Sequence, residues 1–114
     1  CRVVNISSVN GLRGQFGQTK YSAAKAGMIG FSKALAAEGA RSGVTVNVVA
    51  PGYTGTPMVT AMRPEVIENI TNEIPMKRLA TPEETASAVS YLISDAAAYI
   101  TGETLSVNGG LYMH

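Results

Sequence analysis

Three short apolar runs rich in β-branched residues alternate along the chain with longer stretches of helical pattern. The apolar runs cover Arg2–Ser7, Thr45–Ala50 and Thr104–Val107. The first of these runs is typical of a strand that is buried on both faces of a sheet. A strand, a helix and a second strand joined by a short return loop imply a parallel crossover. The pattern therefore predicts an α/β fold with three parallel strands and intervening helices, about half of a doubly wound sheet.

Three helices are predicted between these strands. The first begins near Thr19 and ends near Ser42–Gly43, where glycine adopts the left-handed conformation that closes many helices. The second begins at Pro64, because proline suits the first turn of a helix. The third begins at Thr81-Pro82-Glu83-Glu84, where a capping threonine, a proline at the first helical position and two glutamates coincide, and it ends near Ile93.

Two segments between these elements have neither a helical nor a strand pattern. Gly11, Gly14 and Gly17 punctuate the stretch after the first strand, which predicts a loop. Their spacing is wrong for a dinucleotide-binding fingerprint, which follows the first strand of a βαβ unit. Residues 53–63 contain three threonines, a glycine and two methionines, and this composition predicts a mobile segment.

The chain begins at Cys1, without a methionine and directly at the first predicted strand. A half sheet of this kind leaves one edge strand unpaired and a large apolar surface exposed. We therefore expect residues 1–114 to be the C-terminal half of a single larger domain. On its own, this half is expected to be inactive and poorly soluble.

Composition and charge narrow the classes of function. With 46% hydrophobic and 15% charged residues, the chain has the composition of a protein that buries a core. The net charge of +1 gives no reason to expect a nucleic acid or an anionic membrane as partner. Cys1 is the only cysteine, and neither a signal peptide nor an apolar membrane span is evident, so we expect a cytoplasmic protein. His114 has no candidate partners for a metal site.

Tyr21, Lys25 and Ser8 form the pattern that most clearly indicates catalysis. Residues four apart share one face of a helix, so Tyr21 and Lys25 project side by side. An ammonium one turn away favours the phenolate and suits the tyrosine to general acid and base catalysis. Ser8 follows the first predicted strand, and the carboxyl ends of strands are where open α/β sheets bind ligands. Asn5 and Asn47 are expected instead to satisfy backbone groups of strands and loops.

The segments NISSVNG, YSAAKAG, VNVVAPG and ITGETLSVNGG resemble, in order and spacing, the C-terminal half of the short-chain dehydrogenase/reductase family. This resemblance covers essentially the whole chain and implies a Rossmann-type sheet whose dinucleotide-binding half precedes Cys1. It also implies that Ser8, Tyr21 and Lys25 are the catalytic residues. Tyr21 would then donate the proton in reduction, Ser8 would orient the substrate carbonyl, and Lys25 would also hold the nicotinamide ribose.

Residues 51–56, Pro-Gly-Tyr-Thr-Gly-Thr, resemble the loop of the same family that closes over the nicotinamide. The resemblance implies that Pro51, Gly52, Thr54 and Thr56 bind the cofactor together with Tyr21 and Lys25. The chain departs from the family at Thr54, where an aliphatic residue is usual, and at Pro57, where an acidic residue is common. NADPH is the expected cofactor, with NADH not excluded.

The substrate is expected to be a 3-ketoacyl thioester. The stretch GQFGQTK before Tyr21 and the NGGLYM ending resemble the members of the family that reduce acetoacetyl-CoA for polyhydroxybutyrate synthesis. By this resemblance Gln15, Gln18 and Tyr53 contact the acetoacetyl group, and Lys20 is expected to be solvated. Three alternatives stay open: a 3-oxoacyl-acyl carrier protein reductase, a sugar or polyol dehydrogenase, and an inactive fragment or non-enzymatic relative.

Members of the family are commonly tetramers built through the helix that bears the tyrosine and through the last helix and strand. For this chain the resemblance therefore implies a homotetramer with contacts over residues 26–37 and 105–112.

Overall fold

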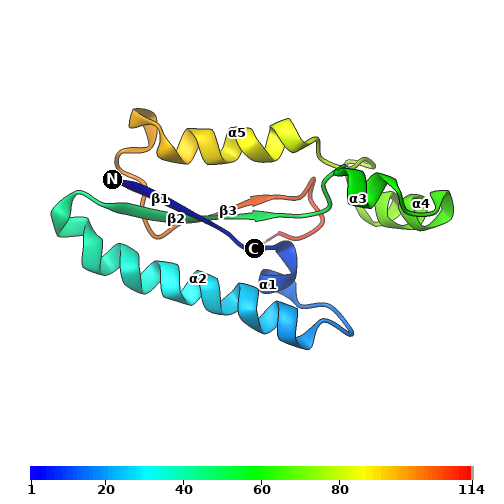
Figure 1. Ribbon diagram of the computed structural model, residues 1–114, viewed down its shortest axis with the longest axis horizontal. Coiled ribbons are helices and arrows are strands. Elements are labelled where there is room, and N and C mark those ends of the chain that lie inside the picture. Colours follow the sequence, from blue (N-terminus) through cyan, green and yellow to red (C-terminus); the bar gives the residue numbers. More distant parts are fainter. Residues whose placement is uncertain (114) are drawn as a thin grey trace.

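In the computed structural model, which describes residues 1–113, three parallel strands form one sheet between two helical layers (Figure 1). The strands β1 (Arg2–Ile6), β2 (Thr45–Pro51) and β3 (Thr104–Val107) lie in the order β1-β2-β3. The long helix α2 (Thr19–Gly39) lies on one side of the sheet and α5 (Pro82–Ile93) on the other. The expected α/β fold with three parallel strands is confirmed.

The core of the molecule is centred on β2. Val46, Val48, Val49 and Ala50 are at most 2% exposed, because helices cover both faces of this strand and neighbours flank both of its edges. The same burial was expected for β1 and is wrong: Arg2 to Asn5 are only half-buried, and Ile6 is 42% exposed. The reason is topological, since β1 is an edge strand of this sheet and has a neighbour on one side only.

The helix ends follow the capping signals in the sequence. The α-helical part of α2 ends at Gly39, and a 3-10 turn over Ala40–Ser42 continues it to Gly43, whose φ of +73° is the left-handed closure that was predicted. Helix α5 begins with the complete capping box of Thr81 and Glu84. Helix α4 (Pro64–Glu73) begins at the predicted proline.

Two short helices occupy segments that were predicted to lack regular structure. Helix α1 (Val9–Arg13) replaces the expected loop, because the Ser8 hydroxyl caps it by accepting a hydrogen bond from the Asn10 amide. Helix α3 (Pro57–Thr60) lies within the segment 53–63 that was expected to be mobile. Thr56 caps this helix, and Pro57 stands at its first position.

None of the helices in residues 1–113 is both long and apolar enough to cross a membrane. His114, for which no metal partners were expected, lies outside the described residues. Within the described part of the chain, no three His, Cys, Asp or Glu side chains gather as a metal site would require.

Candidate active site

The carboxyl ends of the three strands meet at one edge of the sheet, on the right of Figure 1. Ser7 and Ser8 follow β1, Gly52 follows β2, and Asn108 follows β3. The parallel pairing that brings these ends together is the reason that residues from three distant parts of the sequence are neighbours here. The end of the sheet at which the strands finish is where open α/β sheets bind ligands.

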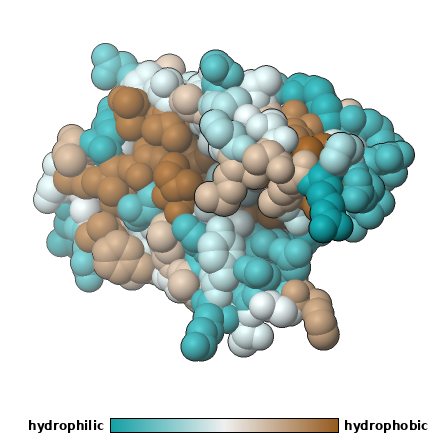
Figure 2. All heavy atoms as spheres, turned by 45° about the vertical axis from the view of Figure 1, so that its right-hand side comes forward, coloured by the Kyte–Doolittle hydropathy of each residue, from teal (hydrophilic) through white to brown (hydrophobic). Residues whose placement is uncertain are grey.

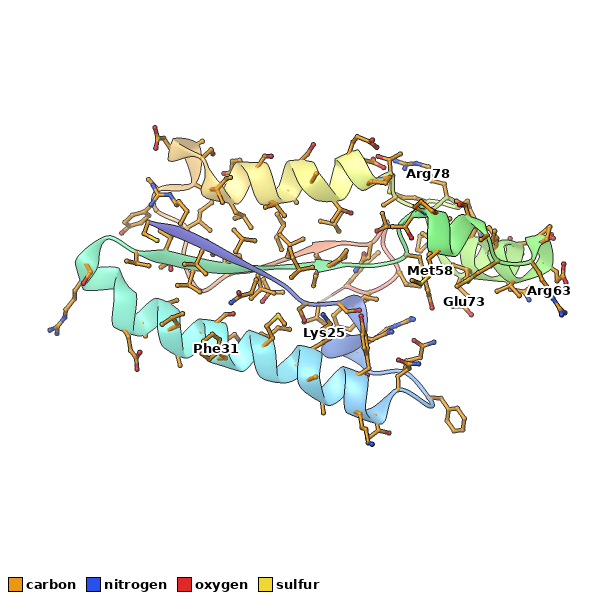
Figure 3. All side chains as sticks on the ribbon, viewed as in Figure 1. Lys25, Phe31, Met58, Arg63, Glu73 and Arg78 are labelled. Atoms are coloured by element: carbon orange, nitrogen blue, oxygen red, sulfur yellow. The ribbon has the colours of Figure 1, made fainter. Side chains whose placement is uncertain are left out.

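Tyr21 and Lys25 lie side by side in the first turns of α2, as their spacing predicted. The Lys25 ammonium lies 5.5 Å from the centre of the Tyr21 ring, which is within the range of a cation–π contact. Tyr21 is 44% exposed, so its phenol is accessible from solvent. The Lys25 Nζ also donates a long hydrogen bond of 3.4 Å to the carbonyl oxygen of Ile6, at the end of β1. The ammonium thus contacts both the strand end and the tyrosine ring, and Figure 3 shows Lys25 on the side of α2 that faces the sheet.

Ser8 follows the end of β1 and caps the start of α1. Its side chain is only 8% exposed, and its Oγ accepts the Asn10 amide hydrogen at a distance of 3.2 Å between Oγ and N. The hydroxyl proton of Ser8 is not used in this bond, because the oxygen is the acceptor. Ser8 therefore keeps a hydrogen-bond donor at the strand end.

Ser7 and Gly11 position Lys25, and neither was identified from the sequence. The Ser7 hydroxyl donates to the carbonyl oxygen of Lys25 at 2.8 Å, and the Ser7 amide donates to Val49 in β2 at 2.8 Å. A Cβ at Gly11 would lie 2.9 Å from the carbonyl carbon of Lys25, so only glycine permits α1 to pack this closely on α2. Ser7 thereby connects the sheet to the helix, and Gly11 connects the two helices, both at Lys25.

Residues 14–18, which contain Gln15 and Gln18 and which we call the glutamine loop, lie at the surface between α1 and α2, close to Tyr21 in the chain. Residues 17–21 line a shallow hollow, to which Gln18 and the exposed Lys20 contribute. Gln15 is exposed, and its Oε1 accepts a hydrogen bond of 2.6 Å from the Asn10 side chain. Two of the residues expected to contact substrate are therefore near the tyrosine in the chain and accessible.

Tyr53, the third residue expected to contact substrate, lines a different cavity. This cavity has a volume of about 320 Å³ and lies between the end of β3 and the segment that leads into α5. Arg78, Glu84 and Asn108 are among the residues in its wall, whereas neither Gln15 nor Gln18 is. The structure of residues 1–113 therefore does not bring Tyr53 and the two glutamines into one pocket.

The segment 51–56 is fixed by its neighbours on both sides. The Gly52 amide donates to Val107 at 2.9 Å, and a Cβ at Gly52 would lie 2.9 Å from the Cβ of Asn108. Thr54 forms an isolated parallel bridge with Ala80. The Thr56 hydroxyl caps α3 by accepting from Val59 at 3.5 Å, which leaves its own proton available.

The cluster with clearly shifted pKa values lies next to this segment. Arg78 donates from both terminal nitrogens to the two carboxylate oxygens of Glu84, at 2.7 and 2.8 Å. The hydrogen bond from Arg78, helped by the backbone amide of Thr81, lowers the pKa of Glu84 from 4.5 to about 2. The same hydrogen bond raises the pKa of Arg78. The sequence identified Glu84 as a capping residue, but gave no signal for its pairing with Arg78.

Asn47 and Asn5 have structural roles, although one expectation about them was wrong. Asn47 is 1% exposed, donates to the backbone oxygen of Ile100 and accepts from the backbone amide of Glu103, both at 3.0 Å, as its expected role requires. Asn5 instead donates to the hydroxyl of Ser32 at 2.8 Å and so links β1 to α2 by a side-chain contact. The difference arises because Asn5 faces the covering helix rather than a loop.

The chain is similar to known proteins along nearly its whole length. A family model described as enoyl-(acyl carrier protein) reductase matches residues 1–112. An acetoacetyl-CoA reductase of Acinetobacter sp. is 72% identical over 113 residues, which are 99% of this chain and 46% of the relative. The nodulation protein G of Azospirillum brasilense is 64% identical over 110 residues, 96% of this chain and 45% of that protein. A 3-oxoacyl-acyl-carrier-protein reductase of Salmonella typhimurium is 54% identical over 112 residues, 98% of this chain and 46% of that enzyme.

The chain thus spans about half the length of the curated relatives that it matches. The family model covers nearly all of it, Lys25 contacts both the Tyr21 ring and the end of β1, and Ser8 directly follows that strand. The chain belongs to the short-chain dehydrogenase/reductase family.

Proposed function

We propose that residues 1–114 are the C-terminal, catalytic half of a cytoplasmic, NADPH-dependent reductase of acetoacetyl-CoA. Its product would be (R)-3-hydroxybutyryl-CoA, a precursor for polyhydroxybutyrate synthesis. The observation that carries this proposal is the Lys25 ammonium, which lies 5.5 Å from the accessible Tyr21 ring and 3.4 Å from the Ile6 carbonyl oxygen at the end of β1. Activity is proposed for the full-length protein that contains this chain.

The open edge of the sheet supports the proposal that another half of the domain packs here. β1 is apolar in sequence and yet half-buried, with one flank unpaired. Apolar side chains also gather in a continuous area on the face shown in Figure 2, and exposed apolar residues include Ile6 and Ile93, at the ends of β1 and α5. A strand added beside β1 would pair this edge and cover apolar surface.

The donors at the strand ends suit a nicotinamide nucleotide. Lys25 makes one long hydrogen bond of 3.4 Å to Ile6, so its ammonium retains donors for ribose hydroxyls. The Thr56 hydroxyl and the backbone of residues 52–54 suit the carboxamide. When bound, the nicotinamide supplies the hydride. The choice of NADPH over NADH rests on the resemblance to biosynthetic reductases.

Three side chains carry the proposed proton chemistry. Tyr21 donates its phenolic proton to the carbonyl oxygen of the substrate, which becomes the hydroxyl of the product. The ammonium of Lys25 stabilises the phenolate that remains. Ser8 donates a hydrogen bond to the same carbonyl oxygen and so polarises the carbonyl before the reaction.

The preference for a CoA thioester is supported by the relatives and by the glutamine loop. The relative named acetoacetyl-CoA reductase is 72% identical, whereas the carrier-protein reductase from Salmonella is 54% identical. In the loop, Gln15 uses its Oε1 to accept from Asn10, which leaves its amide hydrogens for a thioester oxygen. The second candidate is reduction of a 3-oxoacyl-acyl carrier protein, which the Salmonella relative favours.

The test is a comparison of acetoacetyl-CoA with acetoacetyl-acyl carrier protein as substrates of the full-length protein, following the loss of NADPH absorbance. We expect a higher kcat/KM for the CoA thioester, and a Gln18→Ala variant that raises KM for that substrate. A preference for the carrier protein would transfer the proposal to the second candidate. Absence of reduction with both substrates would contradict the proposal and favour a non-enzymatic relative.

A homotetramer is proposed on the resemblance and on the exposed face of α2. Residues 26–37 of α2 include Phe31, which is 61% exposed (Figure 3), and residues 105–112 form the second expected contact. A large exposed aromatic side chain is typical of interface cores. Sedimentation of the full-length protein should give the mass of four chains, and Phe31→Glu should reduce that mass. A monomeric wild-type protein would contradict the proposal.

A further inference from the structure

The segment proposed to contact the nicotinamide is held in place by one residue from a distant part of the chain. The Gly55 amide donates to the Ala80 carbonyl oxygen at 2.7 Å, and the Ala80 amide donates to the Tyr53 carbonyl oxygen at 3.1 Å. These bonds form the isolated bridge between Thr54 and Ala80, outside the main sheet. The backbone of residues 53–55 therefore follows the position of Ala80.

The position of Ala80 is set by two side chains that bind the residues on either side of it. Arg78 donates to the Leu79 carbonyl oxygen at 3.2 Å. Glu84 accepts the Thr81 amide hydrogen at 2.9 Å. Arg78 and Glu84 are themselves joined by two hydrogen bonds of 2.7 and 2.8 Å. The two side chains, together with the Leu79 carbonyl and the Thr81 amide that they bind, hold residues 79–81 in place. We call this arrangement the Arg78–Glu84 clamp.

A second contact attaches the same segment to the first turns of α5. The hydroxyls of Thr54 and Thr85 lie 3.5 Å apart, and Thr85 directly follows Glu84 in the helix. The cavity of about 320 Å³ is lined by Tyr53, Arg78, Ala80 and Glu84, so the clamp and the segment border the same space. Figure 3 shows Arg78 beside the start of α5, close to where β2 ends.

Global stability is a poor explanation for this clamp. The side chains of Arg78 and Glu84 are 51% and 43% exposed. Ion pairs with this exposure contribute little to folding, because water and salt screen them. A planar guanidinium that binds a carboxylate with two parallel hydrogen bonds instead fixes the relative orientation of the two side chains. A fixed orientation of these side chains holds the backbone bridge between Thr54 and Ala80 in one position beside the proposed ligand site.

We propose that Arg78 and Glu84 are positioning residues that hold the Tyr53–Gly55 backbone in place for the nicotinamide ring. This inference rests on the proposed function, since it assumes that residues 51–56 contact the cofactor. The clamp acts on this backbone through Ala80. It sets the discrimination between a cofactor with nicotinamide and one without it.

The test compares two ligands of the full-length protein by isothermal calorimetry: NADPH and 2′-phospho-ADP-ribose, which lacks only the nicotinamide. Arg78→Lys keeps the positive charge and removes the paired hydrogen bonds that the guanidinium donates to Glu84. We expect this variant to bind NADPH about fivefold more weakly, the effect of losing one ordinary hydrogen bond, with unchanged affinity for 2′-phospho-ADP-ribose. Glu84→Gln should give the same selective loss, and the double variant should lose no more than either single variant. Arg41→Lys, an exposed arginine at the far end of α2, is the matched control.

The possible results distinguish a failure of the clamp proposal from a failure of the proposed function. Equal weakening of both ligands in Arg78→Lys and Glu84→Gln would show a general structural effect and overturn the proposal. Unchanged binding of NADPH in both variants would also overturn it, while reduction of acetoacetyl-CoA by the wild type would leave the proposed function intact. If the wild type binds neither ligand, the proposed function fails and the clamp proposal fails with it.

Discussion

Replacing Gly11 with alanine tests how closely α1 must pack on α2 to position Lys25, the proposed catalytic lysine. A Cβ at position 11 would lie 2.9 Å from the carbonyl carbon of Lys25, 2.9 Å from its Cβ and 3.0 Å from the amide nitrogen of Ala26. These atoms belong to the helix backbone or to its first side-chain carbon, so no side-chain rotation relieves the overlap. The two helices must move apart.

The expected cost follows from two opposing effects. Overpacking of a well-packed contact costs about 1–3 kcal/mol. Alanine in a helix is favoured over glycine by about 0.5–1 kcal/mol. The net loss is therefore about 1 kcal/mol, or a Tm lower by about 2–4 °C in a domain of roughly 150–250 residues.

The effect on catalysis should exceed the effect on stability. Ser8 moves with α1, whereas Tyr21 and Lys25 move with α2, so separation of the helices alters the geometry of all three. A misplacement of about 1 Å can cost about 100-fold in rate, and we expect roughly tenfold from a smaller movement. The assay is kcat for acetoacetyl-CoA reduction by the full-length protein, together with a thermal melt of each variant.

Gly14→Ala provides the matched control. Gly14 has a φ of +73° and open space where a Cβ would lie, so alanine there is strained by the backbone but pushes on nothing. This variant should lose a similar amount of stability, about 1–3 kcal/mol, with little loss of kcat. A Gly11→Ala protein with wild-type kcat and wild-type Tm would refute the close-packing argument.

Three further predictions concern the loop anchor, the clamp and the lysine. Asn47→Ala removes two buried hydrogen bonds to the 100–103 loop and should cost about 2–4 kcal/mol, measured by urea denaturation. Because Arg78 lowers the pKa of Glu84 to about 2, the small contribution of this carboxylate to folding is present above pH 4.5 and is lost as the pH falls towards 2. The carboxyl group of Glu84, followed by NMR across a pH titration, should therefore protonate only near the bottom of that range; protonation near pH 4.5 would contradict the pairing. Lys25→Ala should weaken NADPH binding and lower kcat together, because one ammonium serves both; a change in kcat alone would separate the roles.

Local signals in the sequence were sufficient to predict the main elements. The capping box at Thr81 and Glu84, Pro64 and the closing Gly43 each fix a helix end by interactions within a few residues. The spacing of Tyr21 and Lys25 placed them on one face of α2 for the same reason. These predictions succeeded because each depends on neighbours in the sequence.

Contacts between distant residues could not be predicted in this way. Gly11 and Gly14 indicated a loop, and nothing local showed that Gly11 instead permits a helix to pack against Lys25. The partner of Asn5 is 27 residues away on α2, and the partner of the 53–55 segment is Ala80. Each of these pairings exists only after the sheet and its covering helices have assembled.

The burial of the first strand was overestimated for a related reason. An apolar β-branched run predicts a strand, but it does not say how many neighbours the strand has. β1 lies at the edge of the sheet, so its side chains stay half-exposed despite their character. The unpaired side of β1 is also the observation that supports the proposal that a further strand of the full-length protein pairs with β1.

The most direct test of the proposed chemistry is the turnover of a Tyr21→Phe variant of the full-length protein with NADPH and acetoacetyl-CoA. The substitution removes one oxygen from an accessible side chain, so folding should be retained, and turnover is measured at saturating NADPH because Tyr21 is also expected to contact the cofactor. If Tyr21 is the proton donor, kcat falls by at least about 100-fold, the lower range for loss of a general acid. A kcat within a few-fold of the wild type would contradict the assignment of Tyr21, and with it the proposed mechanism.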